Sequence, residues 1–154
     1  MTLADGDRHH PKRRLHHIFA RDGRAVIVAM DGARSGPARG LENPRQAVRN
    51  VVAGGADAIL TTPGMAKATA DQLHGQGLII GLDADDDTSD YGVEAAIRAG
   101  ADAVELKVFP GNPHLSKVDH LRRLAARCDQ WNIDRKSTRL NSSHTDISRM
   151  PSSA

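Results

Sequence analysis

The sequence has few aromatic residues and a single cysteine among its 154 residues. Four aromatic side chains cannot fill a core, so a core must be built from Val, Ile, Leu and Ala. Cys128 alone excludes an intrachain disulfide and a zinc site made of cysteines. No apolar run approaches the roughly 20 residues of a membrane span, and the first residues lack the apolar segment of a secretory leader. We therefore expect one soluble, cytoplasmic domain with no membrane partner.

An excess of charge of one sign is also missing from most of the chain. The formal net charge is +2, and residues 134–154 account for it, because four basic side chains there outnumber two acidic ones. The remaining residues are neutral overall. A neutral surface does not favour binding to a phosphate backbone, so we expect no nucleic-acid partner.

Residues 134–154 differ in composition from everything before them. They contain six serines and show no hydrophobic periodicity. Residues 134–144 resemble the translation of a common sequencing adapter without a gap, and residues 148–154 resemble the other arm of that adapter in the same frame. We therefore expect a non-native, disordered tail that packs against nothing. The alternative is a flexible Ser-rich tail of the protein itself.

The rest of the chain alternates short apolar runs with helical patterns. The runs predict strands at residues 25–30, 58–61, 78–82 and 103–109. Apolar stripes predict helices at 12–20, from Asn43-Pro44 to Gly54, at 65–73, from Val93 to Gly100, and after Ser116. Residues 131–133 would open a fifth strand. We expect an N-terminal helix and barrel floor at 1–24, half a barrel at 25–133, and the tail at 134–154.

Repeated strand–helix units predict a parallel sheet with right-handed crossovers. The sequence G-A-D-A-I at residues 55–59 recurs as G-A-D-A-V at residues 100–104, two units later. The architecture is then a doubly wound sheet or a (β/α)8 TIM barrel. No G-x-G-x-x-G follows the first strand, which weakens the dinucleotide-binding version of the doubly wound sheet. Strand 103–109 favours the barrel, because Glu105 and Lys107 would face its interior near the C-terminal mouth.

Several motifs resemble those of the barrel-type class I aldolases. They are D-G-R before the first strand, A-M-D at its end, G-L-E-N-P at the first helix, and G-A-D-A-I-L-T-T-P-G across the second strand. The resemblance covers residues 14–113. It points to a superfamily of archaeal-type fructose-bisphosphate, tagatose-bisphosphate and deoxyribose-phosphate aldolases. Members often carry Asp-His-Gly where this chain has Asp31-Gly32-Ala33, which leaves the subfamily and substrate open.

The resemblance implies a lyase that makes or breaks a C–C bond of a phosphorylated sugar or related keto compound. Such an enzyme needs a lysine that forms a Schiff base and a group that moves protons. The family's Schiff-base lysine and phosphate site would lie after residue 133, so we expect the chain by itself to be inactive. The resemblance implies no cofactor and a homo-oligomeric parent enzyme. The alternative is a phosphate-binding isomerase or synthase on the same barrel.

Four residues are candidates for the site, which we expect at the C-terminal ends of the strands. Asp31 corresponds by resemblance to the family's proton-moving acid, and its alternative role is to cap the following loop. Lys107 is a second Schiff-base candidate or a charge that tunes the active lysine. Its favoured alternative is an ion pair with Glu105 or Asp31. Asp83 and Glu105 are candidate substrate-binding residues.

No metal site is expected. Asp83, Asp85, Asp87 and Glu94 have calcium-loop spacing, but Thr88 stands where that loop requires glycine. The histidine pairs at 9–10 and 16–17 have no partners at the spacing of a zinc site. We interpret the histidines as part of a solvated helix face or the barrel floor.

Overall fold

The computed structural model describes residues 13–36, 38–82, 92–108 and 116–139. Five parallel strands form one sheet in the order β1-β2-β3-β4-β5. The strands are β1 (Ile27–Ala29), β2 (Ala58–Thr61), β3 (Gly77–Leu82), β4 (Ala103–Val108) and β5 (Asp134–Arg139). The predicted parallel order of the first four strands is confirmed. Within the described residues, no helix is both long and apolar enough to cross a membrane.

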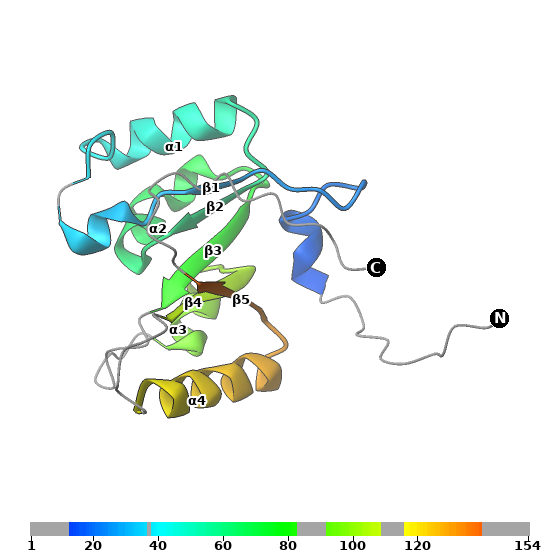
Figure 1. Ribbon diagram of the computed structural model, residues 1–154. Helices are drawn as coiled ribbons and strands as arrows, with labels where there is room; N and C mark the ends of the chain where they lie inside the picture. The colour runs from blue at the N-terminus through cyan, green and yellow to red at the C-terminus, as the bar shows by residue number, and fades with distance from the viewer. Residues whose placement is uncertain (1–12, 37, 83–91, 109–115, 140–154) are drawn as a thin grey trace.

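The four α-helices of the described residues pack on one face of the sheet. They are α1 (Pro44–Ala53), α2 (Pro63–Thr69), α3 (Val93–Arg98) and α4 (Ser116–Gln130). One cluster of buried side chains joins residues of each helix, such as Val48 and Cys128, to strand residues such as Ile59, Ile80 and Val104. Sequential parallel strands with right-handed crossovers require this one-sided arrangement. Figure 1 shows α1 and α4 at opposite ends of the curved sheet, and the fold is a partial (β/α)8 barrel.

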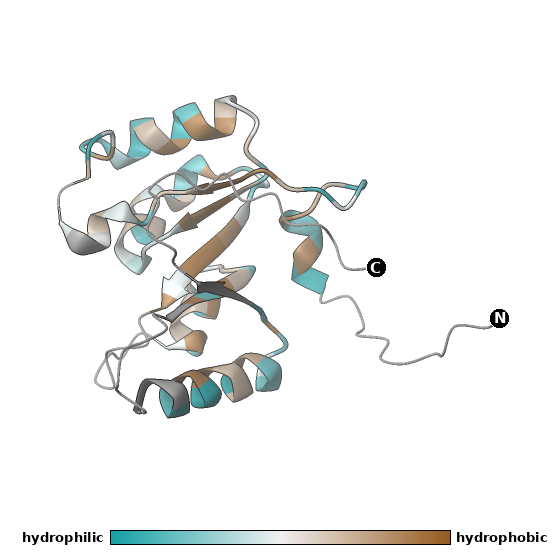
Figure 2. Cartoon of the chain, in the orientation of Figure 1, coloured by the Kyte–Doolittle hydropathy of each residue, from teal (hydrophilic) through white to brown (hydrophobic). Residues whose placement is uncertain are grey.

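The hydropathy of the chain follows these layers. Figure 2 shows β1, β2 and most of β3 in the apolar colour, whereas the helices carry both apolar and polar bands. The four residues of β2 and the six of β3 are all buried. Strands that are covered on both faces read as continuous apolar runs, which is why their positions could be predicted.

The opposite face of the sheet is covered near the strand starts by the N-terminal segment. The 3-10 helix η1 (Arg13–His17) and the residues after it pack there, and Ile18 is 2% exposed. A Cβ built on Gly77, the first residue of β3, would lie 2.7 Å from Ile18 Cγ1 and 2.9 Å from the His17 carbonyl oxygen. Glycine is therefore required for this close approach. The imidazole Nδ1 of His17 lies 2.7 Å from Asp102 Oδ1.

Two helices differ from their predicted form. The helix expected at 12–20 is a 3-10 helix of five residues. The helix expected at 65–73 is split into α2 and the 3-10 helix η3 (Ala70–Gln72). Short 3-10 turns are common at such ends, where tertiary contacts fix the chain more strongly than helix propensity does. A third 3-10 helix, η2 (Gly32–Ser35), follows β1.

The expectation that the tail packs against nothing is wrong for residues 134–139. They form β5 and pair with β4 over six residues, three residues beyond the fifth-strand start expected at 131–133. The physical reason is that α4 returns the chain to the free edge of β4. Backbone N–H and C=O groups at such an edge pair with an extended segment largely independently of its side chains. Residues 140–154 lie outside the described residues.

The internal repeat has a structural role. The carboxylate of Asp57, before β2, accepts a hydrogen bond from the backbone N–H of Val26 over 2.7 Å. The carboxylate of Asp102, before β4, accepts one from the N–H of Leu78 over 2.9 Å. Each aspartate therefore fastens the start of its strand to the start of the preceding strand. We call these two aspartates of the repeated G-A-D the aspartate clamps.

Glu94 joins α3 to the end of α4. Its Oε1 accepts the Trp131 indole N–H over 3.0 Å and lies 2.7 Å from Arg127 Nη2. The pKa of Glu94 is lowered, first by a hydrogen bond from its own backbone N–H. Burial acts against this, and the Trp131 bond and the charges of Arg127 and Arg98 lower the pKa further.

We expect the Glu94 interactions to make stability depend on pH. A carboxylate with a lowered pKa stabilises the fold above its ordinary value of 4.5, and the contribution is lost as the pH falls through the lowered value. Glu94→Gln should therefore cost about 0.5–1 kcal/mol at pH 6.5 and less at pH 3. Urea unfolding at both pH values measures this difference. Equal costs at the two pH values would contradict it.

Candidate active site

The register of the sheet places two buried acids at one level of the sheet. The ladder pairs align four residues in one row: Ala29, Leu60, Ile79 and Ala103. Asp31 follows the first of these residues by two positions and Glu105 follows the last by two. Alternate residues of a strand face the same side, so both acids belong to the next row toward the C-terminal ends. Barrel enzymes carry their chemistry at this end.

Asp31 lies directly after β1 and is 7% exposed. The backbone N–H of Met30 donates to the Leu60 carbonyl over 2.7 Å, which holds the end of β1 against β2. Met30 packs in the cluster on the helix side, so alternation puts Asp31 toward the other face. The side chain of Asp31 makes no capping hydrogen bond to η2, although the residue occupies the N-cap position. The choice between the two roles of Asp31 stays a prediction.

Glu105 is 1% exposed in the middle of β4. Its neighbours Val104 and Leu106 belong to the cluster under the helices, so Glu105 faces the opposite side, as predicted. Its register partner on β3 is Gly81, which adds no side chain to the row. Sequence reasoning did not single out Gly81. The sequence does show a glycine inside an apolar strand at this position, and such a glycine often marks a close approach of a ligand or of another backbone.

The two acids are not sheet neighbours. β1 and β4 are three strand spacings apart, about 14 Å along the sheet. The predicted convergence of the four candidates at one point therefore stays a prediction. The backbone of Lys107 lies in β4, two residues after Glu105, and pairs with Thr138. The side chain of Lys107 and the whole of Asp83 lie outside the described residues.

The described residues offer no metal centre. They contain no group of three or more His, Cys, Asp or Glu side chains that could hold a metal ion. Thr61 Oγ1, at the end of β2, is a buried polar atom with no hydrogen-bond partner in the described part of the chain. It follows Leu60, which packs on the inner face, so alternation puts Thr61 on the helix side, away from the row of acids.

Comparisons with known proteins agree with this architecture. Residues 18–134 match the family described as DeoC/LacD family aldolase, and this match ends at the residue where the adapter-like sequence begins. A 2-amino-3,7-dideoxy-D-threo-hept-6-ulosonate synthase of Halobacterium salinarum is 34% identical over an alignment of 130 residues, with 78% of this chain and 49% of that protein covered. An uncharacterized aldolase of Saccharolobus solfataricus is 37% identical over 136 residues, with 73% and 50% covered.

Solved structures show the same fold. An archaeal fructose-1,6-bisphosphate aldolase with its catalytic lysine bound to a carbinolamine intermediate gives a TM-score of 0.68 at 22% identity, over 82% of this chain and 55% of that one. A Schiff-base-forming fructose-1,6-bisphosphate aldolase gives 0.67 at 22% identity, over 82% and 56%. The chain spans about half the length of the curated relatives it matches. The match over residues 18–134 shows that the chain belongs to the DeoC/LacD aldolase family.

Proposed function

We propose that these residues form the first half of a class I aldolase that acts on a phosphorylated sugar or related keto compound through a lysine Schiff base. The family match supports the aldolase class. The observation that carries the proposal is the burial of Asp31 at the carboxyl end of β1. A buried acid in this position can move protons at the substrate hydroxyl and at the enamine carbon.

The other candidates have supporting roles in this proposal. Glu105 binds a substrate hydroxyl from the same row as Asp31, and Gly81 between them leaves room for the substrate backbone. Lys107 supplies positive charge beside the Schiff-base lysine, or pairs with an acid of the row. Asp83 directly follows β3, which ends at Leu82, and so would approach the same mouth and contact the substrate there.

A synthase on the same barrel is the second candidate. The Halobacterium relative is named a synthase of a dideoxy-hept-6-ulosonate, and it is 34% identical to this chain. The same Schiff-base chemistry run toward C–C bond formation would serve such a product. Turnover of fructose 1,6-bisphosphate by the full-length enzyme would favour the aldolase, whereas turnover only with a second keto substrate would favour the synthase.

The role of Asp31 can be tested in the enzyme encoded by the complete reading frame that carries residues 18–133. Asp31→Asn keeps the shape of the side chain but removes the proton-moving group. We expect its kcat to fall by about 100-fold or more, while borohydride still traps substrate on the enzyme. Asp22→Asn is the matched control, because Asp22 is exposed and bonds the Arg24 backbone N–H. If Asp31→Asn keeps more than half of the wild-type kcat, the assignment fails.

We propose in addition that residues 134–154 are foreign to the enzyme and that the chain as given is inactive. The end of the family match at residue 134 supports the first part. Independent sequencing of the gene tests it, since a reading frame that continues through the tail would contradict it. Treatment of the chain with fructose 1,6-bisphosphate and borohydride tests the second. We expect no covalent adduct, and an adduct on Lys107 in the mass spectrum would contradict the proposal.

A further inference from the structure

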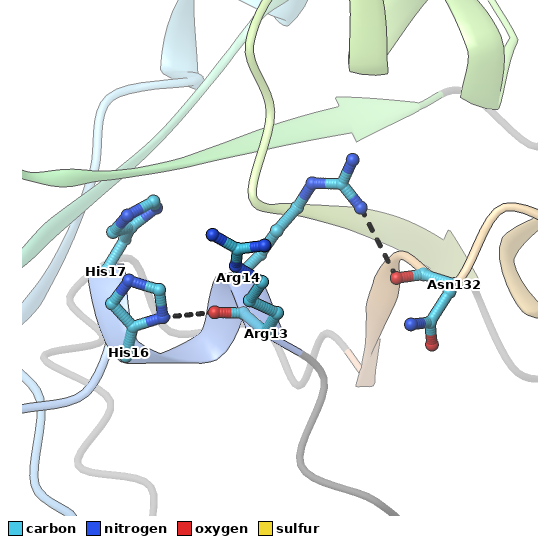
Figure 3. A pocket seen from close by; sticks show the side chains of 5 residues that line it. All are labelled: Arg13, Arg14, His16, His17 and Asn132. Atoms are coloured by element: carbon cyan, nitrogen blue, oxygen red, sulfur yellow. Dashed lines mark hydrogen bonds between the residues drawn. The ribbon is translucent and has the colours of Figure 1, made fainter.

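A basic pocket lies at the end of the sheet where the strands begin, opposite the row of buried acids. It is lined by Arg13, Arg14, His16, His17 and Asn132. Figure 3 shows the two imidazoles on one side and the Arg14 side chain extending to Asn132 on the other, with Arg13 between them. The first four residues belong to η1, which has no acidic residue in its first turn. The fifth lies in the turn after α4.

Each histidine of the pocket has its Nδ1 beside an oxygen atom of the protein. His16 Nδ1 contacts the backbone carbonyl oxygen of Arg13, and His17 Nδ1 lies 2.7 Å from Asp102 Oδ1. A carbonyl oxygen and a carboxylate can only accept, so we assign the proton of each neutral ring to Nδ1. Each Nε2 is left for a further partner. The ring centroids are 4.1 Å apart, so a single small ligand could contact both imidazoles.

The arginines bring permanent charge. One Arg14 nitrogen donates to the Asn132 carbonyl over 3.4 Å, which anchors the guanidinium across the pocket. A guanidinium has five N–H donors, so this single bond leaves donors for a ligand. Asn132 has a φ of 48°, a left-handed backbone that asparagine adopts more readily than most residues. The turn therefore fixes the position of the Asn132 carbonyl oxygen, which accepts the Arg14 hydrogen bond.

The carboxylate beside the pocket, Asp102, already has two hydrogen-bond partners. Asp102 faces His17, but its other oxygen accepts the Leu78 backbone N–H. Two guanidiniums therefore exceed the one carboxylate. A metal ion does not suit this site, because the arginines repel a cation and the described residues hold no cluster of three metal ligands. A tetrahedral oxyanion suits it, because forked guanidinium donors match its oxygens.

We propose that this pocket binds a phosphate-type oxyanion, either inorganic phosphate or the phosphoryl group of a small metabolite. The site is separate from the proposed active site, because it lies at the start of the strands. Arg13 and Arg14 supply the charge-assisted hydrogen bonds.

Titration calorimetry of the full chain with inorganic phosphate tests the proposal. We expect saturable binding in the millimolar range or tighter, weakened about tenfold or more in Arg13→Gln/Arg14→Gln. The matched control is Arg122→Gln/Arg123→Gln, which removes the same charge from α4, where Arg122 lies near Asp119 at the surface. Its affinity should stay within about twofold of wild type. Glycerol 3-phosphate is the second probe, and binding tighter than that of phosphate identifies a phosphorylated metabolite as the ligand.

Thermal unfolding provides a second measurement, which does not require the heat of binding to be large enough for calorimetry. Phosphate should raise the Tm of the wild type and of the α4 control, but not that of Arg13→Gln/Arg14→Gln. Without phosphate the three proteins should show the same circular dichroism. The proposal is overturned if the wild type binds no phosphate at about 10 mM, or if both double variants lose affinity equally.

Discussion

Gly77→Ala should destabilise the protein by about 3 kcal/mol, although it adds only one methyl group. The new Cβ would lie 2.7 Å from a side-chain carbon of Ile18 and within 3.0 Å of backbone atoms of His17 and Ile18. The backbone contacts cannot be relieved by a rotamer change, so the segment after η1 must move off the sheet. Urea unfolding measures the cost. Faster tryptic cleavage at Arg21 or Arg24 would show that this segment is what detaches.

Gly64→Ala is the matched control for this prediction. Gly64 is exposed in α2, and a Cβ there would meet nothing within 4 Å. The same methyl group should stabilise the helix by about 0.5–1 kcal/mol. A destabilisation of similar size in both variants would mean that the contacts of Gly77 are not the cause.

Asp102→Ala should cost about 3 kcal/mol, roughly twice the cost of Asp57→Ala. Both variants lose a carboxylate that accepts a backbone N–H of the preceding strand. Only Asp102 also receives the imidazole of His17, and it is 8% exposed. Loss of Asp102 leaves the Leu78 N–H buried without its acceptor. It also removes the contact that holds His17 of η1 against the sheet.

A double-mutant cycle separates these two contributions. His17→Ala should cost about 1 kcal/mol in the wild type and almost nothing in Asp102→Ala. The difference is the energy of the imidazole–carboxylate contact. Equal costs of His17→Ala in both backgrounds would show that His17 acts through packing alone. Equal costs of Asp57→Ala and Asp102→Ala would also show that the His17–Asp102 contact adds no stability.

The strands β2, β3 and β4 could be predicted because β2, β3 and residues 103–106 of β4 are buried. Such strands appear as apolar runs whatever their neighbours are, and the G-A-D repeat marks where two of them begin. The 3-10 form of η1 could not be predicted, since contact with Gly77 shapes it. A fifth strand was expected to open at residues 131–133, but β5 begins at Asp134. Its extent was not predicted because a polar segment pairs there through backbone groups, which no hydropathy pattern records.

The candidate site was less accessible to sequence reasoning. Asp31 came from the family resemblance, and Glu105 from alternation within one strand. Their common level depends on the register of four strands, which follows from loop geometry and packing and is not encoded in any local pattern. For the same reason the role of Gly81 emerges only when its partner Glu105 is known.

The sequential order of the strands also determines how the chain can assemble. Paired residues are close in the chain, from 19 residues apart for Ala58 and Gly77 to 31 for Ile27 and Ala58. Closing such loops has a modest entropic cost. Each strand can therefore pair as soon as it leaves the ribosome, because its neighbour has already been synthesised. The two aspartate clamps act during this growth, since each fixes a new strand to one that is already in place.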